Sequence, residues 1–241
     1  MTKKIFFILL IILWVNSINI AQLKSINFFS DYSTALTKRL NVTNAKAIGG
    51  GVNVEFDLGK NFSVCLESGY KLYSISQKNQ LLGWGWDFWN NRYSNKIKSD
   101  LQADKNLSVS INSSQKLGII PVILSAKYSY PLSEKFIVSP NFGGGVLFYT
   151  RTLYVIEDWS KKFPTENYTF EYSYRNFAPS KKGNPFVARG GIDINYNFMS
   201  NFWINAEASY SKIFNSGSKY GFNNFLFESE LSTKFGIIFR Y

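Results

Sequence analysis

The sequence predicts an all-β protein: an eight-stranded antiparallel up-and-down transmembrane β-barrel with short periplasmic turns and long external loops. Three observations indicate this fold. Apolar and polar residues alternate with period two through most of the chain after residue 21. No later segment has the roughly 18 consecutive apolar residues that suggest a transmembrane helix. Tight turns alternate with long connections, as they do in barrels whose strands face lipid on one side and the lumen on the other.

The first 21 residues read as a cleaved secretory signal peptide. Two lysines precede an uninterrupted apolar run over Ile5–Val15, and a short polar stretch then leads to Ala21. This run is about half of the roughly 20 apolar residues needed to span a bilayer, so a membrane anchor is disfavoured. We expect cleavage after Ala21, with Ser17 as the alternative site, and one outer-membrane β-barrel domain over residues 22–241.

Seven segments alternate clearly, and a weaker opening strand makes eight. The predicted strands are Ile26–Leu36, Ile48–Leu58, Phe62–Leu72, Gly118–Tyr130, Phe136–Phe148, Phe186–Phe198, Phe202–Tyr210 and Thr233–Tyr241. Tight turns at residues 59–61, 131–134 and 199–201 close three hairpins, and the long connections cover about 75–116, 150–184 and 214–228.

Aromatic residues form 18% of the chain and gather near the predicted strand ends. They are Phe62, Tyr128, Tyr130, Phe136, Phe148, Tyr149, Phe198, Phe202 and Tyr241. Membrane barrels carry such girdles at both interfaces. The alternative is a soluble lipocalin-like periplasmic barrel that binds a ligand inside. Charged residues on the second face of the strands disfavour it, because an apolar-ligand cavity would not hold so many charges.

Charged side chains of both signs share the predicted inward face. They are Glu55, Asp57, Glu67, Lys71, Lys127, Arg189, Asp193, Glu207, Lys234 and Arg240. Eight strands enclose an interior just wide enough for side chains to fill. Unpaired charge there would be costly, so we expect a salt-bridge network that plugs the lumen, with Cys65 as a small filler beside it.

Composition argues against catalysis. The chain has no histidine and one cysteine, which removes triads that need an imidazole and zinc sites built from several His or Cys ligands. We therefore expect no enzyme activity and no catalytic, cofactor-binding or metal-binding residues. The glycine runs at 49–51 and 143–145 are not followed by a helix that could hold phosphate, so we interpret them as sites of strand curvature and close packing.

The net charge is +11, or +9 without Lys3 and Lys4. Such a balance favours anionic partners in general. The basic residues are scattered through loops and strand ends instead of forming a stripe, so nucleic acid is not expected as a partner. Lipopolysaccharide phosphates stay open as a class of ligand.

Two stretches resemble small outer-membrane β-barrel proteins of the OmpA/OmpX kind, and most closely the PorT-like "outer membrane protein beta-barrel domain" family. One is Leu117–Tyr149, with its Ile-Pro strand, tight turn and glycine-rich return strand. The other is the C-terminus, where Lys234, Gly236, Phe239 and Tyr241 are similar to the terminal signal for the barrel-assembly machinery. The resemblance implies the outer membrane of a Gram-negative (diderm) bacterium and that machinery as a partner during biogenesis.

The loop at 75–116 is the best candidate for an external binding segment. Trp84, Trp86 and Trp89 lie close to Arg92, and interleaved aromatic and basic side chains can stack on sugars, bind phosphates or anchor a protein. The alternative is that these tryptophans rest in the membrane interface. The sequence thus favours an integral outer-membrane barrel with a structural or surface-interaction role toward lipopolysaccharide or an envelope protein. A small channel is the alternative.

Overall fold

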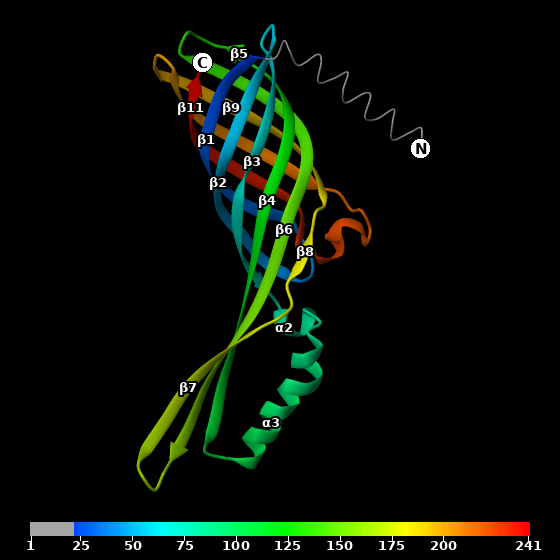
Figure 1. The fold of residues 1–241 in the computed structure, drawn as a ribbon, viewed down its shortest axis with the longest axis vertical. Coiled ribbons are helices and arrows are strands. Elements are labelled where there is room, and N and C mark those ends of the chain that lie inside the picture. Colours follow the sequence, from blue (N-terminus) through cyan, green and yellow to red (C-terminus); the bar gives the residue numbers. More distant parts are fainter. Residues whose placement is uncertain (1–21) are drawn as a thin grey trace.

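The computed structural model describes residues 22–241, and the predicted signal peptide lies outside them. Within this range a sheet closes into a ring of eight antiparallel strands, in the order β4-β3-β2-β1-β11-β10-β9-β6, with β4 paired to β6 (Figure 1). The ring strands are β1 (Gln22–Lys38), β2 (Val42–Gly59), β3 (Phe62–Gln77), β4 (Leu107–Tyr128), β6 (Phe136–Phe163), β9 (Phe186–Met199), β10 (Phe202–Ile213) and β11 (Phe227–Arg240). The predicted eight-stranded up-and-down barrel is confirmed.

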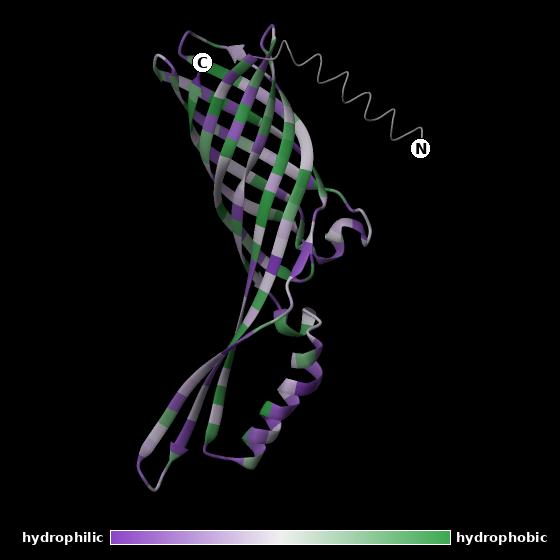
Figure 2. Ribbon diagram, viewed as in Figure 1, coloured by the Kyte–Doolittle hydropathy of each residue, from purple (hydrophilic) through white to green (hydrophobic). Residues whose placement is uncertain are grey.

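The exterior of the ring is apolar, as the alternation predicts. Figure 2 shows hydrophobic and hydrophilic residues alternating along the ring strands. Exposed outward side chains include Phe28, Ile48, Leu66, Leu124, Phe142, Ile192, Ile204, Phe235 and Ile237. A band of large apolar groups that contacts no protein is the surface that lipid covers in a transmembrane barrel. The barrel is therefore of the transmembrane kind.

One end of the barrel carries both termini of the described chain and three short connections (Figure 1). These join β2 to β3, β4 to β6 through β5 (Tyr130–Pro131), and β9 to β10. At the opposite end the first connection is also a tight turn, because β1 and β2 are separated only by residues 39–41. Leu40 and Asn41 take the positive φ angles of 52° and 58° that close this turn. The expected strict separation of short and long connections therefore has one exception.

The long connections contain more regular structure than predicted. β4 and β6 continue well beyond the ring, and β7 (Tyr168–Phe177) pairs with the extension of β6. The other elements are β8 (Lys181–Gly183), α2 (Gln80–Gly83), η2 (Phe88–Tyr93), α3 (Ser94–Ala103) and η3 (Lys219–Asn224). No helix in the described range is both long and apolar enough to cross a membrane. Segments expected to be loops are thus largely strand and helix.

The glycine runs lie where neighbouring strands approach too closely for side chains. Gly51 pairs with Gly69 between β2 and β3, and a Cβ on either glycine would collide with the opposing backbone. Gly145 pairs with Ile123, and a Cβ there would collide with the carbonyl oxygen of Val122. This is the close packing predicted for both runs.

Candidate functional site

The centre of the lumen holds a buried ionic cluster around Glu67. The Arg189 Nη1 and Nη2 atoms donate to its two carboxylate oxygens at 2.6 and 2.8 Å, and Lys234 Nζ donates to Oε2 at 2.7 Å. Lys234 also reaches Glu207, at 3.2 Å. Glu67 and Lys234 are each 1% exposed. The cluster joins β3, β9, β10 and β11 across the barrel, because each strand points every second residue inward.

Two further ionic clusters lie within the same lumen. Lys71 Nζ is 3.0 Å from both Asp31 Oδ2 and Glu230 Oε1. The hydroxyl of Tyr73 donates a second hydrogen bond to Glu230. Each buried cation here faces at least two acceptors, which offsets the cost of removing its charge from water.

The third cluster lies nearer the short turns. Lys127 Nζ is 3.5 Å from Glu55 Oε2 and 3.3 Å from Asp193 Oδ2. Lys24 Nζ adds a contact of 2.8 Å to Glu55. Amide groups extend this cluster, as Asn205 Nδ2 donates to Asp193 Oδ1 at 3.1 Å.

Most of the charges predicted to face inward are buried in these clusters: Glu55, Glu67, Lys71, Lys127, Arg189, Asp193, Glu207 and Lys234. Two lie at the end with the short turns instead. Asp57 accepts the backbone N–H of Gly59 at 3.1 Å, and the Arg240 guanidinium lies 3.8 Å from the ring centroid of Trp203. The thiol of Cys65 is buried and free.

Sequence reasoning missed Asp31 and Glu230. Asp31 lies in the strand with the weakest alternation, and Glu230 lies between the predicted loop and the predicted start of the last strand. A signal for Glu230 existed, because it shares the even-numbered phase of Lys234 on β11. Extending that phase backward would have placed a carboxylate in the lumen.

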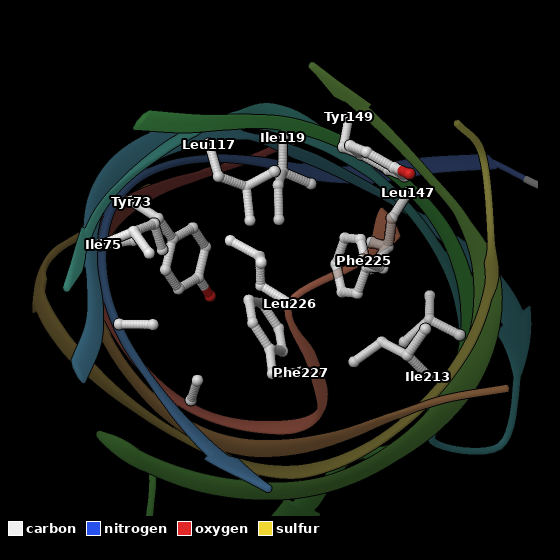
Figure 3. Close-up of a cluster of buried hydrophobic side chains, with 14 of the residues drawn as sticks. Tyr73, Ile75, Leu117, Ile119, Leu147, Tyr149, Ile213, Phe225, Leu226 and Phe227 are labelled. Atoms are coloured by element: carbon white, nitrogen blue, oxygen red, sulfur yellow. The ribbon is translucent and has the colours of Figure 1, made fainter. Parts of the chain in front are cut away.

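An apolar cluster lies in the lumen beyond the ionic clusters, toward the end with the long connections. Figure 3 shows Phe225, Leu226 and Phe227 within the ring of strands. The ring of Phe227 lies 5.0 Å from that of Tyr73, and the ring of Phe225 lies 5.1 Å from that of Tyr149. Tyr149 was expected in an aromatic girdle, but its side chain is buried here because it has the inward phase.

The segment that contributes Phe222, Phe225, Leu226 and Phe227 to this cluster, which we call the plug (residues 222–227), was predicted to be part of an external loop. Arg39 anchors it, since Nη1 donates to the carbonyl of Phe222 at 2.8 Å and the guanidinium lies 4.1 Å from the Phe222 ring centroid. The buried Arg151 donates to the carbonyl of Asn224 at 3.2 Å. The signal in the sequence was the run Phe-Leu-Phe at the end of an otherwise polar loop.

The extension beyond the ring forms a separate unit, which we call the platform (residues 78–115 and 153–179). Its sheet consists of the ends of β4 and β6 together with β7, and α3 lies beside it (Figure 1). A second apolar core holds the unit together, with Trp84, Trp86 and Trp89 packed near Trp159.

The three predicted binding tryptophans are therefore buried, and Arg92 is exposed. Trp84 and Trp89 are only 3% and 4% accessible. The Trp86 and Trp89 rings stack at 5.6 Å. Trp84 and Trp86 still line a surface pocket of about 410 Å³ together with Lys181, so a role in binding stays a prediction. Their evident contribution is to fold the platform.

A buried carboxylate completes the platform core. Glu157 accepts hydrogen bonds from Trp159 Nε1 at 3.0 Å and from the Tyr93 hydroxyl at 3.1 Å, and a third from Asn176. Burial and the hydrogen bond to Glu157 raise the pKa of Tyr93 above its usual value. Three donors around one carboxylate fix η2 and β7 to β6.

We expect Trp89→Ala to destabilise the platform by about 3–5 kcal/mol, the usual cost of truncating a buried large aromatic side chain. The barrel should remain folded because the Trp89 ring packs on Trp86 and Tyr93, which both belong to the platform. Limited proteolysis of the purified protein should then cut within 78–115 while a resistant barrel fragment persists. Arg92→Ala is the matched control and should leave the cleavage pattern unchanged.

Three of the four residues of the C-terminal signal lie in the last ring strand, and Tyr241 directly follows it. Lys234 is part of the central ionic cluster, and Gly236 lies against Asn27 of β1. The Phe239 ring packs 5.3 Å from Phe202 and 4.9 Å from Tyr241. Similar aromatic pairs lie around this end of the barrel, namely Phe62–Tyr128, Phe136–Tyr196 and Phe198–Phe202.

Deleting Tyr241 should lower the amount of folded barrel in the membrane. The residue is exposed and contributes little packing, but its N–H donates to the carbonyl of Lys24 at 3.1 Å where the first and last strands close the ring. Heat-modifiable migration of membrane fractions measures the folded fraction, with Tyr241→Phe as the control. Unchanged folded protein after the deletion would contradict an assembly role.

No group of His, Cys, Asp or Glu within residues 22–241 is arranged to hold a metal ion. No family model matches the sequence, and no curated protein matches it. Solved structures with a similar chain path do exist. Neisserial surface protein A has 10% identity and a TM-score of 0.44, covering 92% of this chain and 99% of that one. OprG from Pseudomonas aeruginosa has 13% identity and a TM-score of 0.43, covering 91% and 97%. A major outer membrane protein from Thermus thermophilus has 14% identity and a TM-score of 0.42, covering 90% and 99%.

Proposed function

We propose that this chain is an integral outer-membrane protein of a Gram-negative bacterium that acts at the cell surface through its platform, with a closed lumen and no catalytic role. The apolar exterior and ionic interior of the ring support the location, because barrels of this pattern are found in that membrane. The same pattern argues against the lipocalin-like alternative, whose interior would have to receive an apolar ligand.

A closed lumen is supported by two layers of side chains in series. Along β3 the inward residues run from Glu67 and Lys71 to Tyr73 and Ile75, so ionic clusters are followed by apolar packing. The plug contributes to the second layer. This stacking favours a structural or binding role over the alternative of a small channel.

The observation that carries the surface role is the platform itself. A loop that only connected strands would not need its own buried core, whereas rigid scaffolds commonly present binding surfaces. Among the described residues β7 pairs only with β6, so the backbone of its other edge is free. β7 also exposes Tyr168, Phe170 and Tyr174. A free edge of this kind accepts an extended segment of another protein by strand addition, so we propose that an envelope or surface protein docks there.

Site-specific photo-crosslinking in the native cells tests this role. A photoreactive residue at Thr169, Glu171 or Ser173 would sample the free edge of β7, and the same residue at Ser133 in a short turn is the control. We expect discrete heavier adducts when the probe stands at an edge position. In a protein that carries the probe at Thr169, the added change Ser173→Pro should abolish the adduct. Absence of adducts at every edge position, in cells whose barrel is folded, would contradict the proposal.

One partner and one family relationship follow from the C-terminal strand and the resemblance described above. We propose that the barrel-assembly machinery binds the last strand during biogenesis, and that the chain is related to the PorT-like barrels. The deletion of Tyr241 described above tests the first of these.

A further inference from the structure

A cleft of about 590 Å³ opens on the outer wall of the barrel, over β3, β4, β6 and β8. Its apolar part is lined by Tyr70, Leu72, Ile120 and Phe148. These side chains have the outward phase and are exposed. The cleft is therefore on the lipid-facing side and is separate from both the lumen and the platform.

The cleft crosses the boundary of the apolar band on the side of the long connections. On β3 the outward residues change from Leu72 to Ser74, and on β6 they change from Phe148 to Thr150. The strand register aligns these changes, because Gly118 of β4 pairs with both Leu72 and Thr150. One end of the cleft thus lies at the level of acyl chains and the other at the level of headgroups.

The headgroup end combines two cations with two hydroxyls. Lys116 pairs with Thr152 across β4 and β6, and Lys182 pairs with Thr150 across β6 and β8. All four line the cleft. Because paired residues in a sheet point to the same side, the two lysines flank the two threonines on one surface.

Neither lysine forms an ion pair within residues 22–241. Both side chains are exposed. The aliphatic part of each lysine can lie along the barrel wall while its ammonium group contacts an anionic group at the interface. The cleft is deep between the two lysines because two of its lining residues, Gly118 and Gly183, have no side chains.

We propose that this cleft binds lipid A, the phosphorylated and acylated glycolipid of the outer leaflet. One phosphate contacts Lys116 and Lys182, the sugar hydroxyls meet Thr150 and Thr152, and an acyl chain lies along Tyr70, Ile120 and Phe148. Charge complementarity selects a phosphate at the boundary, and the apolar half of the cleft selects a lipid over free phosphate. The inference depends on the proposed outer-membrane location.

Native mass spectrometry of the purified, folded barrel in detergent tests the site. Lipid A, phosphatidylglycerol and inorganic phosphate are titrated separately. We expect a one-to-one lipid A complex whose affinity falls at least tenfold in Lys116→Gln/Lys182→Gln. Lys38→Gln/Lys46→Gln is the matched control, since both lysines are exposed on the same end of the barrel outside the cleft. Heat-modifiable migration verifies that each variant is folded.

Three outcomes would overturn the proposal: equal binding by the Lys116/Lys182 double variant, equal loss in the control, or phosphatidylglycerol bound as tightly as lipid A. If a glutamine variant fails to fold, Phe148→Ser with both lysines intact replaces it, and full lipid A affinity in that variant would also count against the site. Membrane fractionation of cells tests the location by itself. A barrel found elsewhere would refute the proposed function without changing the binding result.

Discussion

Replacing Glu67 by alanine is expected to lower the free energy of unfolding by about 3–5 kcal/mol, the range for breaking a buried ion pair from one side. The carboxylate is the shared acceptor for Arg189 and Lys234, so its loss leaves two buried cations short of a partner. Lys234 retains Glu207 at 3.2 Å, whereas Arg189 loses both of its charge-assisted hydrogen bonds. The effect should therefore act mainly through Arg189.

Urea unfolding in lipid or detergent, followed by tryptophan fluorescence, measures this change. Asp57→Ala is the matched control because Asp57 is an inward-phase carboxylate at the rim whose contact is a backbone N–H. It should cost less than about 1 kcal/mol, as surface changes usually do. Glu67→Met combined with Arg189→Met should cost less than the sum of the two single variants, since the pair is removed together. Full stability of Glu67→Ala would show that water, and not the carboxylate, solvates Arg189.

The barrel could be read from the sequence because its physics is local. Lipid outside and charge inside impose a period of two on every ring strand, and the turn residues between strands then fix the hairpins. The inward phase of Glu67 and Arg189 followed from this alternation alone. Their direct contact did not follow, because residues 122 positions apart meet only through the shear and closure of the whole ring.

The platform and the plug could not be predicted for a related reason. Beyond the membrane β4 and β6 are paired in water, and on β4 a polar run over residues 112–116 separates the short alternation at 107–111 from the membrane-spanning part. The tryptophans around Trp86 were recognised as unusual, but they are buried against Leu153, Val155 and Trp159 of β6, which lie far along the chain. A hydrophobic run in a loop, such as Phe225–Phe227, can bind outward or fold inward. Here the choice depends on Arg39 and Arg151, whose side chains hold the segment within the lumen.

The plug should be dispensable for closing the lumen but important for stability. Phe225→Ala combined with Phe227→Ala removes two fully buried rings, and each truncation of this kind costs about 3–5 kcal/mol when the cavity does not collapse. Conductance should nevertheless stay low, since the ionic clusters around Glu67 and Lys71 lie in series with the apolar layer. Planar bilayer recording of the wild type and of this variant should therefore show no stable open steps.

Opening the lumen should require both layers to be weakened together. In a protein that carries Phe225→Ala, Phe227→Ala and Arg189→Ala, an ionic cross-link and the apolar seal are lost at once, and water can form a continuous path. We expect conductance steps in this combined variant only, with Arg92→Ala in the wild-type background as a control that touches neither layer. Stable steps on the order of a nanosiemens in the wild type, the scale of a wide water-filled barrel, would instead identify the chain as a channel. Two barriers in series block flow as long as either one remains. Steps in the double phenylalanine variant would therefore show that the plug alone closes the lumen.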